Sequence, residues 1–343
     1  MRTFEKYLAV WVALCMLAGI VLSQTIPGVG EAIDSWQIRG ISVPIGICLF
    51  LMMYPAMLNL QLSELRKLRQ NPKPIVLTLL SNWLVAPLVA ALLANLFLKG
   101  NDELVVAVIL LGSSPCTAMV LVWGRLAKGN QEQNVLNTSL NTVTILFGYA
   151  PIVSLLTGIQ GIPIDRWLLA ISAFVFIGVP LVLGIVSKRV LSNVRGEAWF
   201  ETTYRPTVDR IAIVALLTTL VVLFSLNGQV LLGNFDALLL ISVPLLLGFV
   251  VVVAYNLLIT RASRLAYREA IITVIIGSSS HFEIAIATAV AIYGVGSYAA
   301  LGTTMGLFWE VPIMLGLVAL GKGLRRRGFW ERDTTQKAPA PAA

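Results

Sequence analysis

A carboxylic acid, a thiol and the single histidine of the chain lie inside long apolar segments. Glu283 is near the middle of the ninth such segment, with His281 two residues before it, and Cys116 is in the middle of the fourth. An ionisable side chain at bilayer depth is costly and by default indicates a functional site. Burial opposes ionisation of Glu283, whereas the start of a helix favours it, and this balance suits an acid that exchanges protons.

Cys116 follows Pro115, and we expect it in the first turn of a half-helix, where the helix dipole favours the thiolate. A thiolate is a soft ligand, so this position suits a soft metalloid. The alternative is a small apolar core residue, which is how buried cysteines usually behave. We assign that role to Cys15 and Cys48, which lie in uninterrupted segments. The three cysteines have no spacing typical of a zinc site or a disulfide framework.

Each of the other polar groups near the acid and the thiol has two interpretations. His281 either relays protons and contacts a ligand together with Glu283, or is a neutral side chain held by backbone carbonyl groups. Glu283 itself either exchanges protons or closes a capping box. The hydroxyl groups either bind a ligand or satisfy interrupted backbone, and both roles are compatible. These hydroxyl residues are Ser113, Ser114, Thr117, Ser278, Ser279 and Ser280.

Glycine–serine runs interrupt both of these apolar segments, at 112–114 and at 277–279. After the first run, Ser114 suits an N-cap and Pro115 the first helical position. After the second, the Ser-His-Phe-Glu sequence at 280–283 has the capping-box pattern. We therefore expect two broken helices. Broken helices at corresponding positions of two halves are the best sequence indication of a secondary transporter's binding site.

The whole composition is that of a polytopic membrane protein. The 343 residues are 57% hydrophobic and only 12% charged, with a mean hydropathy of +0.86. A spanning helix needs about 20 apolar residues. Ten segments qualify: 7–26, 43–60, 73–98, 104–127, 133–158, 166–189, 207–228, 235–260, 268–295 and 297–320. The net charge of +8 is explained by membrane topology, so we expect no nucleic-acid partner.

Basic residues predict the orientation in the cell membrane. With the N-terminus inside, nearly all of the 25 lysines and arginines lie on the cytoplasmic side. Arg39, Lys99 and Arg166 are the ones in outer loops. Both termini are therefore predicted to be cytoplasmic. The C-terminal segment 323–343 ends in an Ala-Pro repeat and is predicted to be a disordered tail.

The two glycine–serine runs are about half a chain apart, and five apolar segments precede and follow the midpoint. An odd number of spans in each half means that the second half is inserted upside down. We therefore predict two inverted five-helix repeats, at 1–165 and 166–322.

Several function classes have no support in the sequence. It contains no phosphate loop, HExxH, nucleophile elbow or dinucleotide-binding fingerprint. We therefore expect neither an enzyme nor a cofactor. No loop is long enough for a nucleotide-binding region, so active transport would need an ion gradient. The oligomeric state stays open.

Three stretches resemble the arsenical-resistance-3 family of arsenite efflux permeases, in the bile acid/arsenite/riboflavin transporter superfamily. The first joins residues 33–38 to the Leu-Met-Met-Tyr-Pro run at 51–55. The second is the run 115–123, which begins Pro-Cys-Thr-Ala-Met, together with 126–129. The third is 282–287 together with 310–315. The resemblance covers nearly the whole membrane region.

The resemblance implies ten helices in two inverted repeats, with discontinuous helices 4 and 9 crossing at the site. Helices 3–5 and 8–10 would form a core, and helices 1, 2, 6 and 7 a panel. It also implies export of arsenite, in some members antimonite, in exchange for protons. The family's essential cysteine corresponds to Cys116 and its essential glutamate to Glu283. The family usually has asparagines before Phe-Glu, where this chain has Ser280 and His281.

The chemistry of the substrate fits this set of residues. Arsenite is a neutral trihydroxide near neutral pH, and a transporter must release what it binds. One thiol at Cys116, with nearby hydroxyls and Glu283, would bind arsenic reversibly, whereas three thiolates would hold it too tightly. The alternative is a sodium-coupled importer of an organic anion, which needs several convergent oxygen ligands for sodium. A membrane sensor is disfavoured because the chain has no output domain.

Overall fold

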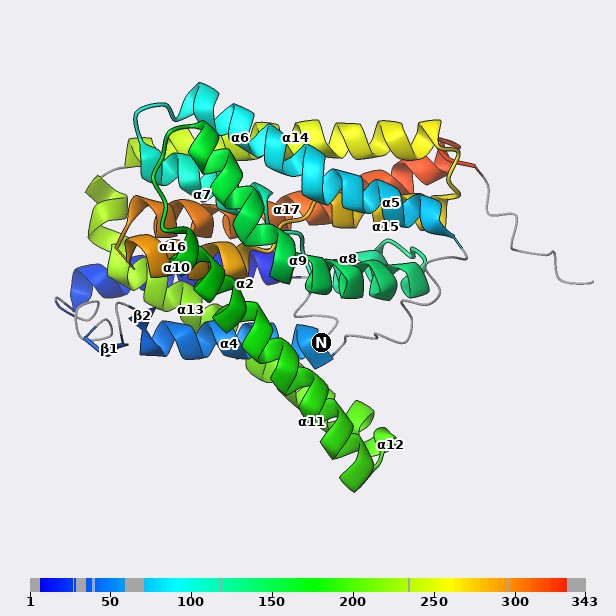
Figure 1. The fold of residues 1–343 in the computed structure, drawn as a ribbon, viewed down its shortest axis with the longest axis horizontal. Coiled ribbons are helices and arrows are strands. Elements are labelled where there is room, and N and C mark those ends of the chain that lie inside the picture. The colour runs from blue at the N-terminus through cyan, green and yellow to red at the C-terminus, as the bar shows by residue number, and fades with distance from the viewer. Residues whose placement is uncertain are drawn as a thin grey trace, which may run out of the picture.

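The computed structural model describes residues 7–26, 28, 35–38, 41–58, 71–117, 119–233, 235–294 and 296–331. Within these ranges the protein is almost entirely helical (Figure 1). The one sheet in the described part pairs two-residue strands, β1 (Gln37–Ile38) and β2 (Ile41–Ser42), in antiparallel register.

The first half contains α2 (Leu8–Thr25), α4 (Val43–Leu58), α5 (Pro72–Leu80), the π-helical turn η2 (Ser81–Val85), α6 (Ala86–Phe97), α7 (Asp102–Gly112), α8 (Met119–Leu126) and α9 (Gln131–Ile159). The second half contains α10 (Arg166–Ala173), η3 (Phe174–Gly178), α11 (Val179–Arg195), α12 (Glu197–Trp199), η4 (Phe200–Tyr204), α13 (Arg205–Gly233), α14 (Phe235–Ala262), α15 (Tyr267–Gly277), α16 (Phe282–Tyr293) and α17 (Tyr298–Arg326).

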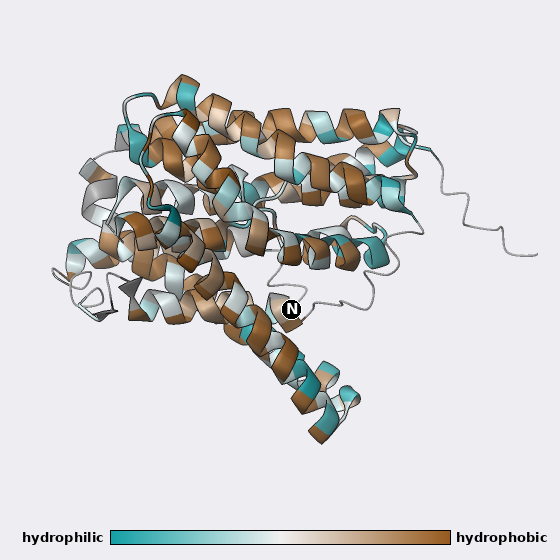
Figure 2. Ribbon diagram, viewed as in Figure 1, coloured by the Kyte–Doolittle hydropathy of each residue, from teal (hydrophilic) through white to brown (hydrophobic). Residues whose placement is uncertain are grey.

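Six helical stretches among the described residues are long and apolar enough to cross a membrane, and three shorter apolar helices accompany them. Figure 2 shows hydrophobic residues along most of the helix lengths. The protein is therefore a multi-pass membrane protein. Where the structure describes the predicted apolar segments, they are helical apart from breaks in the fourth and the ninth. The fourth segment consists of α7 and α8, and the ninth of α15 and α16, each pair separated by a non-helical break.

The helices pack in two groups (Figure 1). In the first group, α13 packs against α2 and α4, and α11 packs against α4. In the second, α6 packs against α7 and α14, while α17 packs against α7, α14 and α16. Most side chains of α7, α15 and α16 are buried, and α16 also contacts α4 and α10, so both broken helices lie in the interior.

Glycines at the ends of the first half-helices allow neighbouring helices to approach closely. A Cβ atom at Gly112 would overlap the Cβ of Ala90 on α6. A Cβ atom at Gly277 would lie 2.7 Å from Oδ1 of Asn256 and 2.9 Å from Oγ of Ser81. A side chain larger than that of glycine would therefore not fit at the start of either break.

The substitution Gly112→Ala should destabilise the fold by about 1 to 3 kcal/mol, because the added methyl group overpacks the contact with α6. Thermal unfolding of the detergent-purified protein would show this as a lower Tm. Gly316→Ala on α17 is the matched control, because a Cβ there meets nothing within 4 Å. Equal Tm values for the two variants would contradict the close approach.

The C-terminal segment differs from the sequence prediction. The helix α17 continues to Arg326, and Trp330 is buried. The Trp330 indole N–H donates to Oγ1 of Thr260 at 3.1 Å, and its ring packs on Tyr267. Residues 323–331 are therefore ordered, because the aromatic side chains supply apolar area for docking. The remainder of the predicted tail, 332–343, lies outside the described residues, as does Arg39.

Candidate functional site

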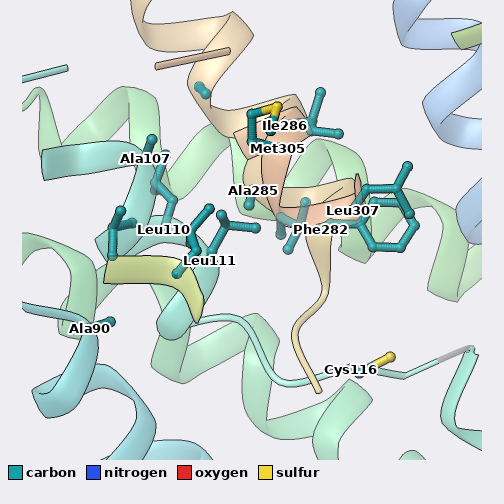
Figure 3. Close-up of a cluster of buried hydrophobic side chains, with 14 of the residues drawn as sticks. Ala90, Ala107, Leu110, Leu111, Cys116, Phe282, Ala285, Ile286, Met305 and Leu307 are labelled. Carbon is teal, nitrogen blue, oxygen red and sulfur yellow. The ribbon is translucent and has the colours of Figure 1, made fainter. Parts of the chain in front are cut away.

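The two breaks cross each other as extended segments. Pro115 and Ser280 form an isolated antiparallel bridge. Beside it, the backbone N–H of His281 donates to the carbonyl oxygen of Ser114 at 2.7 Å. Figure 3 shows the segment that carries Cys116 passing the segment that leads into Phe282. The crossing point lies in the interior, because both segments are buried or nearly so.

The predicted start of the half-helix after the first break was wrong. Pro115 lies in the extended bridge, and α8 begins only at Met119. Cys116 is therefore in the break and not in the first helical turn, so a helix dipole at that turn does not act on its thiol as predicted. The reason is tertiary: pairing with Ser280 holds Pro115 in an extended conformation.

The predicted capping box after the second break was also wrong. The N-cap of α16 is His281, and it makes no side-chain capping hydrogen bond. The motif requires the serine at the N-cap, but Ser280 lies one residue before it. Its hydroxyl donates to Oε2 of Glu310 at 2.5 Å. The bridge to Pro115 and this bond to α17 together keep Ser280 extended.

Glu310 is a site residue that the sequence analysis did not select. Its carboxylate is 2% exposed and accepts three hydrogen bonds from the second break. The Ser279 hydroxyl donates to Oε1 at 2.5 Å, and the backbone N–H of Ser280 donates to the same oxygen at 3.0 Å. The Ser280 hydroxyl donates to Oε2. The sequence signal was an acid inside an apolar helix, two residues before Pro312.

The structure brings His281 and Glu283 together. Nδ1 of the imidazole lies 2.9 Å from Oε2 of the carboxylate, and the two side chains are 1% and 7% exposed. The angles of this contact do not make a hydrogen bond, and within the described residues neither imidazole nitrogen has a hydrogen-bond partner. Glu283 also interacts electrostatically with Glu310. Two acids and one imidazole therefore adjoin the second break.

Two asparagines hold the first break. Asn141 on α9 donates from Nδ2 to the carbonyl oxygen of Cys116 at 3.1 Å. Asn82 in η2 donates in turn to Oδ1 of Asn141 at 3.2 Å. Asn141 therefore satisfies backbone that the break leaves without a helical partner.

A serine–asparagine pair holds the second break. Ser81 in η2 donates to the carbonyl oxygen of Gly277 at 2.8 Å. Asn256 on α14 donates to the hydroxyl oxygens of Ser81 and Ser278, at 2.8 and 3.1 Å. Consecutive residues of η2, Ser81 and Asn82, therefore serve the two different breaks. π-helical turns are rare and frequently occur at functional sites.

The hydroxyl groups of the first break have different environments. The Ser114 hydroxyl donates to the carbonyl oxygen of Leu111 at 2.9 Å and so satisfies backbone. Among the described residues, Oγ of Ser113 and Oγ1 of Thr117 are buried without a hydrogen-bond partner. Within the same ranges no group of three His, Cys, Asp or Glu side chains is placed to hold a metal ion. A cargo at Cys116 would therefore meet one thiol and not a closed cage.

A cavity of about 80 Å³ adjoins the crossing on the side of α6 and α14. Its wall includes Ser114 and Pro115 of the first break and 278–280 of the second. Residues of α6 and α14 also line it, both small ones such as Ala90 and Gly248 and larger apolar ones such as Phe249. None of the lining residues is charged, and neither Cys116 nor Glu283 is among them.

An apolar helical bundle with two interrupted helices crossing at buried acids is typical of a secondary membrane transporter. A family model described as the sodium bile acid symporter family matches residues 46–234. The chain belongs to this family, as a member of its Acr3 type.

Individual relatives cover almost the whole chain. It is 38% identical to an uncharacterized transporter of Synechocystis, over 98% of this chain and 92% of the relative. It is 36% identical to the arsenical-resistance protein Acr3 of Alkaliphilus metalliredigens, over 94% and 93% respectively. It is 29% identical to the arsenical-resistance protein Acr3 of Corynebacterium glutamicum, over 92% and 87%.

Proposed function

We propose that this protein exports trivalent arsenite from the cytoplasm in exchange for protons, and that antimonite is a second substrate. The observation that carries the proposal is the crossing of two broken helices, with a thiol at Cys116 in one and a buried acid at Glu283 beside the other. The similarity to two arsenical-resistance proteins along nearly their full length supports it.

Cys116 is the proposed ligand of arsenic. Its carbonyl oxygen is fixed by Asn141, so the thiol projects from a backbone that is held in place. Hydroxyls at Ser113 and Thr117, which lack partners among the described residues, would complete the contacts with the hydroxide groups of the cargo. When the thiol bonds to arsenic, one hydroxide of the cargo leaves and takes up the thiol proton as water. A single thiol allows release, because the reverse reaction with water has to break only one bond to sulfur.

Glu283 and His281 are the proposed proton-coupling pair. Their 2.9 Å approach lets a proton on one side chain stabilise the charge of the other. Arsenite binds from the cytoplasm when Glu283 is deprotonated, and a proton from outside then favours release. Ser280, which pairs with Pro115, transmits this change to the first break.

The proposed architecture has ten spans, in two inverted five-helix repeats at 1–165 and 166–322. Helices 3–5 and 8–10 would form a core around the breaks, with helices 1, 2, 6 and 7 as a panel. The packing of α13 on α2 and α4 supports the panel, and the packing of α17 on α7 and α16 supports the core. The distribution of basic residues supports cytoplasmic termini in the cell membrane.

The alternative, a sodium-coupled importer of an organic anion, is not favoured. The cavity beside the crossing is small, and no lysine, arginine or histidine lines it to receive an anion. The similarity to a sodium-dependent transporter of Bacillus subtilis is 29% over only 53% of this chain.

The direct test measures arsenite in everted membrane vesicles from a host that lacks its own exporter. We expect uptake that depends on a proton gradient and not on sodium, and host cells that tolerate more arsenite when they express the chain. Uptake driven by sodium alone would support the alternative, and the absence of arsenite uptake in energised vesicles would refute the proposal.

A further inference from the structure

The cavity beside the crossing has the size and chemistry of a site for a small neutral solute. Its volume of about 80 Å³ is far below that of a steroid-sized anion. Hydroxyl-bearing residues of both breaks, Ser114 and 278–280, line it together with Asn82, and the rest of the lining is apolar. Pro115 lines the cavity, and Cys116 is the next residue in the chain. Cys116 itself does not line the cavity.

Hydrogen bonds to Glu310 determine what this polar wall offers to a solute. A serine hydroxyl has one proton to donate and two lone pairs to accept with. Ser279 and Ser280 both donate their protons to the Glu310 carboxylate. Within the cavity these two hydroxyl oxygens therefore present only lone pairs, so they accept hydrogen bonds from whatever is bound there.

Protonation of Glu310 changes this arrangement. The carboxylate already receives three donors, from two hydroxyls and the backbone N–H of Ser280. A proton on Glu310 adds a fourth donor among the same groups. When that proton points toward a serine, the serine hydroxyl turns to accept it, and its own proton points elsewhere. The wall of the cavity thereby loses acceptor capacity.

We infer that the cavity is a second cargo site, distinct from Cys116, for a small neutral polyhydroxy solute, and that Glu310 acts on it through Ser279 and Ser280. The inference rests on the proposed function, for which the solute is arsenite. A trihydroxide donates hydrogen bonds, so it fits the accepting wall that ionised Glu310 creates. Protonated Glu310 weakens that fit and favours release.

Few other ionisable groups adjoin Glu310. Glu283 of α16 interacts with it electrostatically, and His281 contacts Glu283. The charged residues of the other elements packed against α17 lie in the first two turns or the last turn of their helices, away from the breaks: Asp102, Glu103, Arg125, Arg205, Asp209, Arg210, Asp236, Arg261, Arg268 and Glu269. An experiment on the pH dependence of binding must therefore distinguish titration of Glu310 from titration of Glu283 and His281.

The test measures equilibrium binding of sodium arsenite to the purified full chain carrying Cys116→Ala, which removes the thiol. Binding should remain measurable. Ser279→Ala and Ser280→Ala should each weaken it by about fivefold, the value of one lost hydrogen bond. Gly248→Ala should weaken arsenite binding, because the added methyl group narrows the cavity. The substitution should not disturb the fold, because the new Cβ meets only Leu93, at 3.7 Å.

Matched controls distinguish the cavity from general damage to the fold. Ser172→Ala removes a buried hydroxyl on α10 that does not line the cavity. Gly316→Ala adds a methyl group to open space on α17. Neither should change arsenite binding, and all variants should elute as folded protein in size-exclusion chromatography.

A pH series assigns the switch to Glu310. In the Cys116→Ala protein, arsenite binding should weaken from neutral to mildly acidic pH. Glu310→Gln should bind weakly at every pH, because the amide donates to one serine as a protonated acid does. Glu283→Gln in the same background should retain the pH dependence.

Three results would overturn the inference: no arsenite binding without the thiol, unchanged binding in the serine variants, or a pH dependence that survives Glu310→Gln. Each of these leaves the proposed function intact if vesicles with the unaltered chain still take up arsenite. Failure of that uptake would instead refute the proposed function itself.

Discussion

Glu283→Gln should abolish proton-driven arsenite uptake in everted vesicles, with a loss of at least about 100-fold. The substitution keeps the size of the side chain but removes the group that gains and loses the proton. Hydrogen bonds to charged groups contribute about 1.5 to 3 kcal/mol, and since each 1.4 kcal/mol corresponds to about tenfold, the upper value is about 100-fold. Glu283 is buried and contacts His281. An acid on the protein surface therefore cannot take over its proton exchange.

The measurement should separate coupling from substrate binding. We expect Glu283→Gln to bind arsenite more weakly, as the protonated acid does in the proposed cycle, while a proton gradient no longer accelerates uptake. Glu197→Gln, on the exposed surface of α12, is the control and should behave as the unaltered chain does. Full proton-driven uptake by Glu283→Gln would show that another group carries the proton. Glu310 would then be the first candidate, since it interacts with Glu283 across the break.

Cys116→Ala should lower arsenite transport to a similar extent, by about 100-fold. Partners that only orient a metal ligand change affinity by about 10 to 100-fold, so removing the ligand itself should cost at least the upper value. The protein should remain folded, because alanine fills most of the volume of a buried cysteine and Asn141 still bonds to the backbone at 116.

Cysteine-to-alanine variants at the two other positions are the matched controls. Cys15 and Cys48 are half-buried in α2 and α4, far in sequence from either break. Neither substitution should change arsenite uptake, and treatment with a thiol-blocking reagent should inhibit only chains that retain Cys116. Equal transport by Cys116→Ala and the unaltered chain would show that arsenic crosses the membrane without a bond to sulfur.

The breaks were predictable because their cause is local. A run of glycine and serine favours a turn or loop within an apolar segment, and the segments with such runs at 112–114 and 277–279 are interrupted in the structure. The exact start of each second half-helix was not predictable. Propensity favoured helix from Pro115 and from 281 onward after a Ser280 cap, but pairing between the two segments keeps Pro115 and Ser280 extended.

The role of Glu310 could not be predicted from its own segment alone. The sequence placed it in an apolar helix near a proline, and only the fold revealed that it accepts three hydrogen bonds from a break about thirty residues earlier. The same applies to η2, where Ser81 and Asn82 reach different breaks.

Residue order alone was enough to predict a membrane protein, the positions of its apolar helices, and the burial of Glu283, His281 and Cys116. These follow from hydropathy and from backbone propensity, which act over a few neighbouring residues. Only the tertiary structure decided which partner each buried polar group has and which side of the crossing is hollow. Hydrogen bonds between distant segments are short and directional, so their choice depends on how the helices pack and not on local sequence.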